Sequence, residues 1–168
     1  AARYPSRPDC LCVNLLLDCA AETEFTLRLR LPDWVLDGAS LSVDGEAVPC
    51  TSDDDGFISI HHVWKENTVC LNLPLSLQSF PLPDMPDTVA FRYGPMALAG
   101  LCAEERMLYG DKKDPRTMLT ADNEREWASW KPTFRLVNQP VGMRFIPLKD
   151  VGYEPYTVYF PVRPVSSK

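Results

Sequence analysis

The stretch 25-FTLRLRL-31 decides the fold class, because its apolar side chains recur at every second residue. Side chains of an extended chain point alternately to opposite faces, so this spacing is that of a half-buried β-strand. The face that we expect to be buried carries Phe25, Leu27, Leu29 and Leu31. The same alternation continues in 69-VCLNLPLSL-77, where Pro74 favours a sheet edge or a bend.

Turn signals and short apolar runs extend this pattern along the chain. Asp44-Gly45 lies between two short runs in 40-SLSVDGEAV-48 and supplies the positive φ of a type I′ hairpin turn. Two further strands flank Gly94-Pro95, namely 89-VAFRY-93 and 96-MALAGL-101. Other strands are expected in 57-FISIHHVW-64, 134-FRLV-137, 141-VGMRFIPL-148 and 155-PYTVYFPV-162.

Proline limits the helical content. The chain has 16 prolines in 168 residues, nearly twice the usual share of about 5%, and they are scattered, which excludes long helices. We therefore predict an all-β fold, an antiparallel β-sandwich or sandwiches with about nine or ten short strands. One short helix is expected near residues 120–130, with Thr120 or Asp122 as its N-cap.

The proline-rich segment 78-QSFPLPDMPD-87 is where we expect a boundary in the chain. Domain boundaries fall in exposed segments of this composition. We predict a first β-sandwich domain at residues 1–78 and a second β domain, packed on the first, at residues 79–168. Two β layers around one shared core are the alternative.

The charge balance argues against two classes of partner. The net charge is −6, whereas phosphate backbones and anionic lipid surfaces both select clustered Lys and Arg. No apolar run approaches the roughly 18–20 residues of a membrane-spanning helix. We therefore expect neither nucleic acid nor membrane as a partner.

The residue types that bind metals do not show a metal-binding spacing. There are six cysteines but no Cys-x-x-Cys, and His61 and His62 are the only histidines. We expect the cysteines to be small, buried side chains of a reduced protein, and we predict no metal and no cofactor. A redox or metal role for Cys10 and Cys12 is the alternative. The turn at residues 53–56 lacks the later ligands of a calcium loop.

No catalytic constellation emerges from the sequence. A glycosidase needs two carboxylates about 5–10 Å apart in a cleft, and adjacent acids such as Glu104 and Glu105 are typical of a surface. The chain has no nucleophile elbow and no glycine-rich phosphate loop. We predict no catalytic residue, and an autonomous enzyme remains an alternative.

Two tryptophans are the candidate carbohydrate-binding residues. Trp127 and Trp130 are three residues apart on the expected helix and therefore share a face. Exposed tryptophan rings can stack on the C–H face of a sugar. The alternative is that both rings anchor the helix to the sheet, since large aromatic side chains are usually mostly buried.

Five segments, in order, resemble the β-rich C-terminal part of the β-L-arabinofuranosidase group of glycoside hydrolases (families 127 and 146, long called a domain of unknown function). They are RLRLPDW, SLSVDGE, GFISIHHVWKENTVCLNLPLSL, DTVAFRYGPMALAG and MRFIPLKDVGYEPYTVYFPV. The resemblance runs from about Arg3 to Val162. Glu66-Asn67 stands where the family has Gly-Asp, a departure that does not threaten the fold.

The resemblance implies that an (α/α)6 barrel precedes these β domains in a longer polypeptide. In the family that barrel carries the catalytic cysteine, zinc-binding thiolates and a glutamate, with a Glu-x-Cys and an adjacent Cys pair. This chain has neither pattern, so no catalytic residue is carried over. The chain begins AARYPSRPD, which we take as the start of a processed or excised part of a larger protein.

The resemblance therefore implies a non-catalytic accessory β-sandwich region that packs on the barrel. The expected partners are the catalytic barrel of the same polypeptide, a second copy in a homodimer, and an arabinose-containing glycan. The alternative function is a carbohydrate-binding module for such glycans, with Trp127 and Trp130 as its contact residues.

Overall fold

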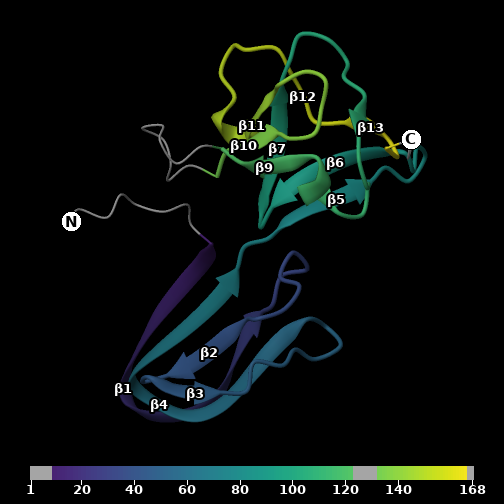
Figure 1. Cartoon of the computed structure of the whole chain (residues 1–168). Coiled ribbons are helices and arrows are strands. Elements are labelled where there is room, and N and C mark those ends of the chain that lie inside the picture. Colours follow the sequence, from purple (N-terminus) through teal and green to yellow (C-terminus); the bar gives the residue numbers. More distant parts are fainter. Residues whose placement is uncertain (1–8, 123–131, 166–168) are drawn as a thin grey trace, which may run out of the picture. The chain divides into compact units, whose positions relative to one another are not determined.

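The computed structural model describes residues 9–122 and 132–165, and within them it contains only strands, turns and short 3-10 helices (Figure 1). One sheet has four strands and the other has nine, so the all-β prediction is confirmed. None of the described residues belongs to a helix long and apolar enough to cross a membrane. The chain separates into two compact units, Asp9–Leu75 and a second that takes in the residues from Ser76 onward. The predicted boundary after residue 78 stays a prediction.

The first unit holds the four-stranded sheet, in the order β1-β4-β2-β3 with every pair antiparallel. Its strands are β1 (Cys10–Arg30), β2 (Ser40–Val43), β3 (Glu46–Val48) and β4 (Phe57–Pro74). The predicted hairpin joins β2 to β3, with φ of 53° at Asp44 and 87° at Gly45. Two successive positive φ values are what a type I′ turn requires, which is why Asp-Gly stands there.

β1 and β4 form one long ribbon that bends (Figure 1). Their register shifts between Asp18 and Thr23, where β1 carries extra residues opposite β4. One apolar cluster takes side chains from both halves of the ribbon, including Val69 and Leu71 from one half and Ile58 and Trp64 from the other. The ribbon therefore bends around this cluster, and both of its halves contribute to one core.

The turn before β4 is held by Asp53. Its Oδ1 accepts hydrogen bonds from the N–H groups of Phe57 at 2.8 Å and Asp55 at 3.1 Å, and its Oδ2 accepts one from Arg28 at 2.6 Å. The hydrogen bond from the Phe57 backbone, followed by the Arg28 interaction, lowers the pKa of Asp53 below its ordinary 3.8. The acidic turn that resembled a calcium loop is thus a side-chain-capped turn.

Asp53 should give the first unit a pH-dependent stability. Because its pKa is lower in the folded state, its contribution is present above about pH 3.8 and is lost as the pH falls through the lowered value. Asp53→Asn should therefore lower the melting temperature at about pH 7 and weaken its fall below about pH 4. Thermal denaturation across this range measures both. Parallel curves for the two proteins would assign the pH dependence to other carboxyl groups.

The second unit holds the nine-stranded sheet, in the order β8-β13-β6-β7-β11-β10-β9, with β5 beside β6 and β12 beside β7. All pairs are antiparallel except β8 with β13. The strands are β5 (Leu77–Pro81), β6 (Thr88–Tyr93), β7 (Met96–Leu101), β8 (Leu108–Tyr109), β9 (Leu119–Ala121), β10 (Phe134–Leu136), β11 (Arg144–Pro147), β12 (Tyr156–Thr157) and β13 (Phe160–Arg163). The 3-10 helices are η1 (Pro115–Thr117) and η2 (Leu148–Asp150).

Three phenylalanines form the centre of this second core. Phe160 lies 5.1 Å from Phe145 and 5.9 Å from Phe91 between ring centroids, and Phe91 lies 5.7 Å from Phe145. All three are buried. The strand predicted at 89–93 is confirmed as part of β6, and Val89, Phe91 and Tyr93 are its buried positions.

The structure corrects three local predictions. The run 69–77 is not one strand, since β4 ends at Pro74 and β5 begins at Leu77. The run 155–162 is likewise broken: β12 pairs with β7 and β13 with β6, so the chain changes neighbours between them. Residues 120 and 121 lie in β9, where pairing with β10 outweighs the capping signal. Residues 123–130 of the expected helix lie outside the described residues.

Candidate functional site

The predicted site residues Trp127 and Trp130 lie outside the described residues. Their role in sugar binding therefore stays a prediction. We next consider the described cysteines, the clefts and the outer faces of the sheets.

The cysteine pair at the start of β1 is a thiol pair. Cys12 donates from its Sγ to that of Cys10 at 3.8 Å. Burial first, and then the hydrogen bond with Cys12, raises the pKa of the Cys10 thiol, which keeps it protonated at neutral pH. Within residues 9–122 and 132–165 there is no group of three or more His, Cys, Asp or Glu side chains placed to hold a metal ion.

The second unit has an open cleft of about 590 Å³. Segments far apart in the sequence meet there. Its described lining combines the polar residues Asp87, Asp111, Lys112 and Asn138 with the apolar residues Val162, Pro164 and Val165. Volumes of about 300–1,000 Å³ are usual for small-molecule sites, so this cleft is the candidate binding site.

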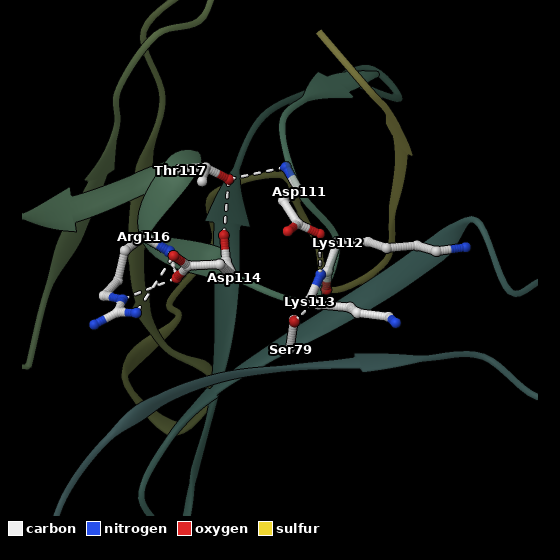
Figure 2. A network of polar contacts seen from close by, with 7 residues as sticks. All are labelled: Ser79, Asp111, Lys112, Lys113, Asp114, Arg116 and Thr117. Atoms are coloured by element: carbon white, nitrogen blue, oxygen red, sulfur yellow. Dashed lines mark hydrogen bonds and ion pairs between the residues drawn. The ribbon is translucent and has the colours of Figure 1, made fainter.

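A network of hydrogen bonds fixes the loop of residues 110–117, which carries Asp111 and Lys112 (Figure 2). The Thr117 hydroxyl accepts from the Asp111 N–H at 2.9 Å and donates to the Asp114 carbonyl at 2.7 Å. Asp111 in turn accepts from the Lys113 N–H at 2.8 Å. Ser79 of β5 donates to the Lys112 carbonyl at 2.5 Å. The loop is therefore tied both to itself and to the sheet.

Asp114 closes this loop against η1. Its carboxylate accepts from the backbone N–H of Arg116 at 3.1 Å and from the Arg116 Nε at 2.8 Å. The side-chain hydrogen bond with Arg116 lowers the pKa of Asp114, so this carboxyl remains ionised and structural. In Figure 2, Arg116 turns back onto Asp114, whereas Lys112 extends away from the network.

Lys112 spans from the loop to a second segment of the cleft. Its ammonium group donates to Asp87 Oδ1 at 2.6 Å and to the Pro86 carbonyl at 3.0 Å. The carboxylate of Asp87 is 81% exposed, so it has room to accept further hydrogen bonds from a ligand. Asn138, in the left-handed region at φ 57°, donates to the Thr117 carbonyl at 3.4 Å.

Sequence analysis missed these cleft residues. The charged segment 105-ERMLYGDKKDPRTM-118 is a loop for most of its length, and it also holds β8 and η1. The partners Asp87 and Asn138 belong to segments with no local signal of their own. Only the pairing of β13 with both β6 and β8 brings the segments together.

The first unit has a second feature, a part of its outer sheet face without charged side chains, which ends at the facing pair Asp18 and Glu66. It is made of outward positions on β1, β4 and β2 that are cross-strand neighbours. We call it the uncharged face; its residues are Cys10, Cys12, Asn14, Leu16, Thr68, Cys70, Asn72, Pro74, Ser40 and Ser42. Leu16 is 82% exposed in the middle of β1.

The outward positions beyond the bend of the same ribbon are different. Glu24, Arg28 and Arg30 on β1 lie across from Val63, Ser59 and Phe57 of β4. Arg28 forms an ion pair with Asp53, and His61 lies 3.1 Å from Glu24. Ordinary soluble surfaces carry about 25–35% charged residues, so the uncharged face is the exceptional one.

The first comparison identifies the N-terminal half. Residues 2–75 match the family model described as the middle domain of GH127 β-L-arabinofuranosidases. This segment is similar to the GH127 middle domain. The matched range ends where the first compact unit ends, at residue 75.

Solved structures are similar to most of the chain, beyond the segment that matches the GH127 middle domain. A GH127 β-L-arabinofuranosidase from Geobacillus stearothermophilus T6 matches 93% of this chain with 21% identity and a TM-score of 0.68. A GH127 β-arabinofuranosidase matches 93% with 18% identity and a TM-score of 0.66. A structure described as a glycoside hydrolase matches 90% with 18% identity and a TM-score of 0.62. At these identities the likeness establishes a shared fold.

The match covers only a part of each related structure. The chain spans 29% of the Geobacillus chain and 30% of each of the other two. A search of curated proteins found no match. The resemblance to the β-L-arabinofuranosidase group is thus confirmed, and it concerns a β region of a larger type of protein.

Proposed function

We propose that this chain is the non-catalytic accessory β region of a β-L-arabinofuranosidase-like glycoside hydrolase, packed on the (α/α)6 catalytic barrel of the same polypeptide. The match of residues 2–75 to the GH127 middle domain carries the proposal. The coverage of 29% and 30% of the GH127 chains supports it, because most of such a protein lies outside this region. On this proposal residues 1–78 and 79–168 are two β domains.

The chemistry of the described carboxyl groups supports a non-catalytic role. A glycosidase acid needs a raised pKa so that it carries a proton at working pH. Wherever a carboxyl pKa departs from its ordinary value among the described residues, it is lowered, as at Asp44, Asp53 and Asp114. In each of the three, hydrogen bonds from neighbouring groups stabilise the ionised form.

The isolated chain should not hydrolyse an aryl β-L-arabinofuranoside. The described carboxyl groups with a shifted pKa, Asp44, Asp53 and Asp114, are all shifted downward, and the family's catalytic cysteine pattern is absent from the sequence. Release of the aryl group can be followed by absorbance over hours, with and without a zinc chelator. Turnover by the purified chain that resists the chelator would contradict the proposal.

The uncharged face supports the packing role. Side chains without charge lose little hydration energy when another protein surface covers them, whereas burying unpaired charges is costly. Covering Leu16 would contribute about 1.5–3 kcal/mol. We propose that this face of the first unit contacts the barrel, and that the charged positions beyond the bend remain in water.

Leu16→Asp should therefore break association with the barrel segment of the parent polypeptide. A charge placed in an apolar contact is expected to weaken binding about thirtyfold or more, close to 2 kcal/mol. Titration calorimetry of the two separately expressed parts measures this. Since Leu16 is 82% exposed, its replacement should leave the fold of this unit intact.

Val63→Asp is the matched control. Val63 is 48% exposed and lies across from Glu24 on the charged part of the ribbon. Its replacement should leave association unchanged. Equal weakening by both variants, or by neither, would remove the uncharged face as the docking surface. Self-association of the chain lost in Leu16→Asp would favour the homodimer instead.

The alternative function, a carbohydrate-binding module that uses Trp127 and Trp130, stays a prediction. Both tryptophans lie outside the described residues, so the structure offers no contact for them. Trp127→Ala combined with Trp130→Ala should abolish binding of arabinose-containing glycans under this alternative. Under the accessory role the double variant binds the barrel as the parent does.

A further inference from the structure

The lining of the cleft in the second unit combines two kinds of chemistry. Asp87, Asp111 and Lys112 are polar, and Val162, Pro164 and Val165 are apolar. Sugar rings have the same duality, since their C–H faces are apolar and their hydroxyl groups both donate and accept hydrogen bonds. An apolar lining with a small number of placed polar groups is also the usual composition of small-molecule sites.

The polar side chains that line the cleft have unused hydrogen-bonding capacity. Asp87 uses Oδ1 for Lys112, and a carboxylate has room for about four hydrogen bonds in total. Asp111 uses only its Oδ1, for Lys113. In the described part of the chain, neither the Oδ2 of Asp111 nor the Oδ1 of Asn138 has a hydrogen bond. Acceptors and an ammonium donor therefore face the cleft together.

The polar groups are held in place before any ligand arrives. The Gly110 N–H donates to the Arg163 carbonyl at 2.9 Å, which ties the loop to β13. A Cβ at Gly110 would lie 2.5 Å from Met118 Cγ and 2.8 Å from Thr117 Oγ1, so the backbone is packed closely there. With the network of Figure 2, these contacts limit the loop to one arrangement. Such preorganisation reduces the entropy lost on binding.

The charges in the cleft favour a neutral ligand. Two carboxylates, Asp87 and Asp111, and one ammonium group, Lys112, line it. The local excess of negative charge agrees in sign with the net charge of −6 on the whole chain. An anion such as phosphate would be repelled by both carboxylates, whereas hydroxyl groups can donate to them.

We propose that this cleft binds a neutral sugar residue, with Asp87 and Lys112 bonding its hydroxyl groups and Val162 and Pro164 contacting its ring. The site does not depend on the accessory role, since it lies within one unit and needs no barrel. It is also argued without Trp127 and Trp130, which lie outside the described residues.

Amide NMR titration of the whole chain with two neutral trisaccharides, arabinotriose and maltotriose, tests the proposal. Saturable shifts are expected at the amides of Gly110, Lys112 and Asn138, with a dissociation constant in the millimolar range for at least one of them (about −4 kcal/mol is 1 mM). Inorganic phosphate, the anionic probe, should produce no saturable shift at these amides.

Two variants decide whether the shifts come from the cleft. Asp87→Ala should weaken binding at least about tenfold, and its fold should persist because the carboxylate is 81% exposed. Asp150→Ala is the control, since Asp150 pairs with Lys149 at 2.7 Å in the same unit but does not line the cleft. Absence of shifts at about 50 mM of both sugars, saturation by phosphate alone, or equal affinity in both variants would overturn the proposal.

Discussion

Trp64→Ala is expected to lower the free energy of unfolding of the first unit by about 3–5 kcal/mol, enough to unfold most small domains. Trp64 is fully buried at the bend of the β1–β4 ribbon. Its ring lies 5.6 Å from that of Phe25, and its Nε1 donates to the Phe25 carbonyl at 2.9 Å. The variant would lose this packing and leave the carbonyl without its donor.

Amide NMR spectra at increasing urea concentration measure this effect for each unit separately. Resonances of residues 9–75 should collapse early in Trp64→Ala, while those of the second unit keep the urea midpoint of the parent. Val63→Ala is the matched control, because Val63 is the exposed neighbour and should change stability by less than about 0.5 kcal/mol. Simultaneous collapse of both units would show that they share one cooperative core.

Phe160→Ala is the reciprocal change in the second unit, again with an expected loss of about 3–5 kcal/mol. Phe160 is fully buried between Phe91 and Phe145. The close approach of Gly100, where a Cβ would lie 2.6 Å from the Phe160 Cζ, shows how tightly the ring is packed. Removing the ring should leave a cavity that the surrounding strands cannot close.

The same urea experiment measures the stability of each unit in this variant. Resonances of the second unit should collapse first, and those of residues 9–75 should keep their midpoint. Tyr159→Ala, at the adjacent exposed position, should leave both midpoints close to those of the parent. If Phe160→Ala destabilises the first unit as much as the second, the proposal of two domains is wrong.

Strands with one buried face and one solvent-exposed, charged face were predictable from the sequence. The alternation in 25-FTLRLRL-31 is visible because charged residues occupy its outward positions. The earlier part of β1 escaped notice because Leu16 and two cysteines replace polar residues on its outward face. A strand whose two faces are both free of charge loses its period-two signal.

Short strands and the candidate site were beyond such reasoning. β9 has three residues, which are too few to show an alternating pattern. Its partner strand β10 is separated from it in the sequence. The cleft combines Asp87, Lys112 and Asn138, whose proximity follows from strand order rather than from spacing. The polar composition of residues 110–117 predicts a loop, but it does not show which other segments this loop contacts.

The thiol of Cys12 provides the most direct test of the proposed accessory role, because it is exposed on the uncharged face. We would compare its rate of alkylation by iodoacetamide in the isolated chain and in the polypeptide that includes the barrel, with mass spectrometry as the readout. The control is a thiol introduced by Thr26→Cys on the charged part of the ribbon. The account predicts slower labelling of Cys12 in the longer polypeptide, by about tenfold or more, and equal labelling of the control thiol. Equal labelling of Cys12 in both proteins would contradict docking through this face.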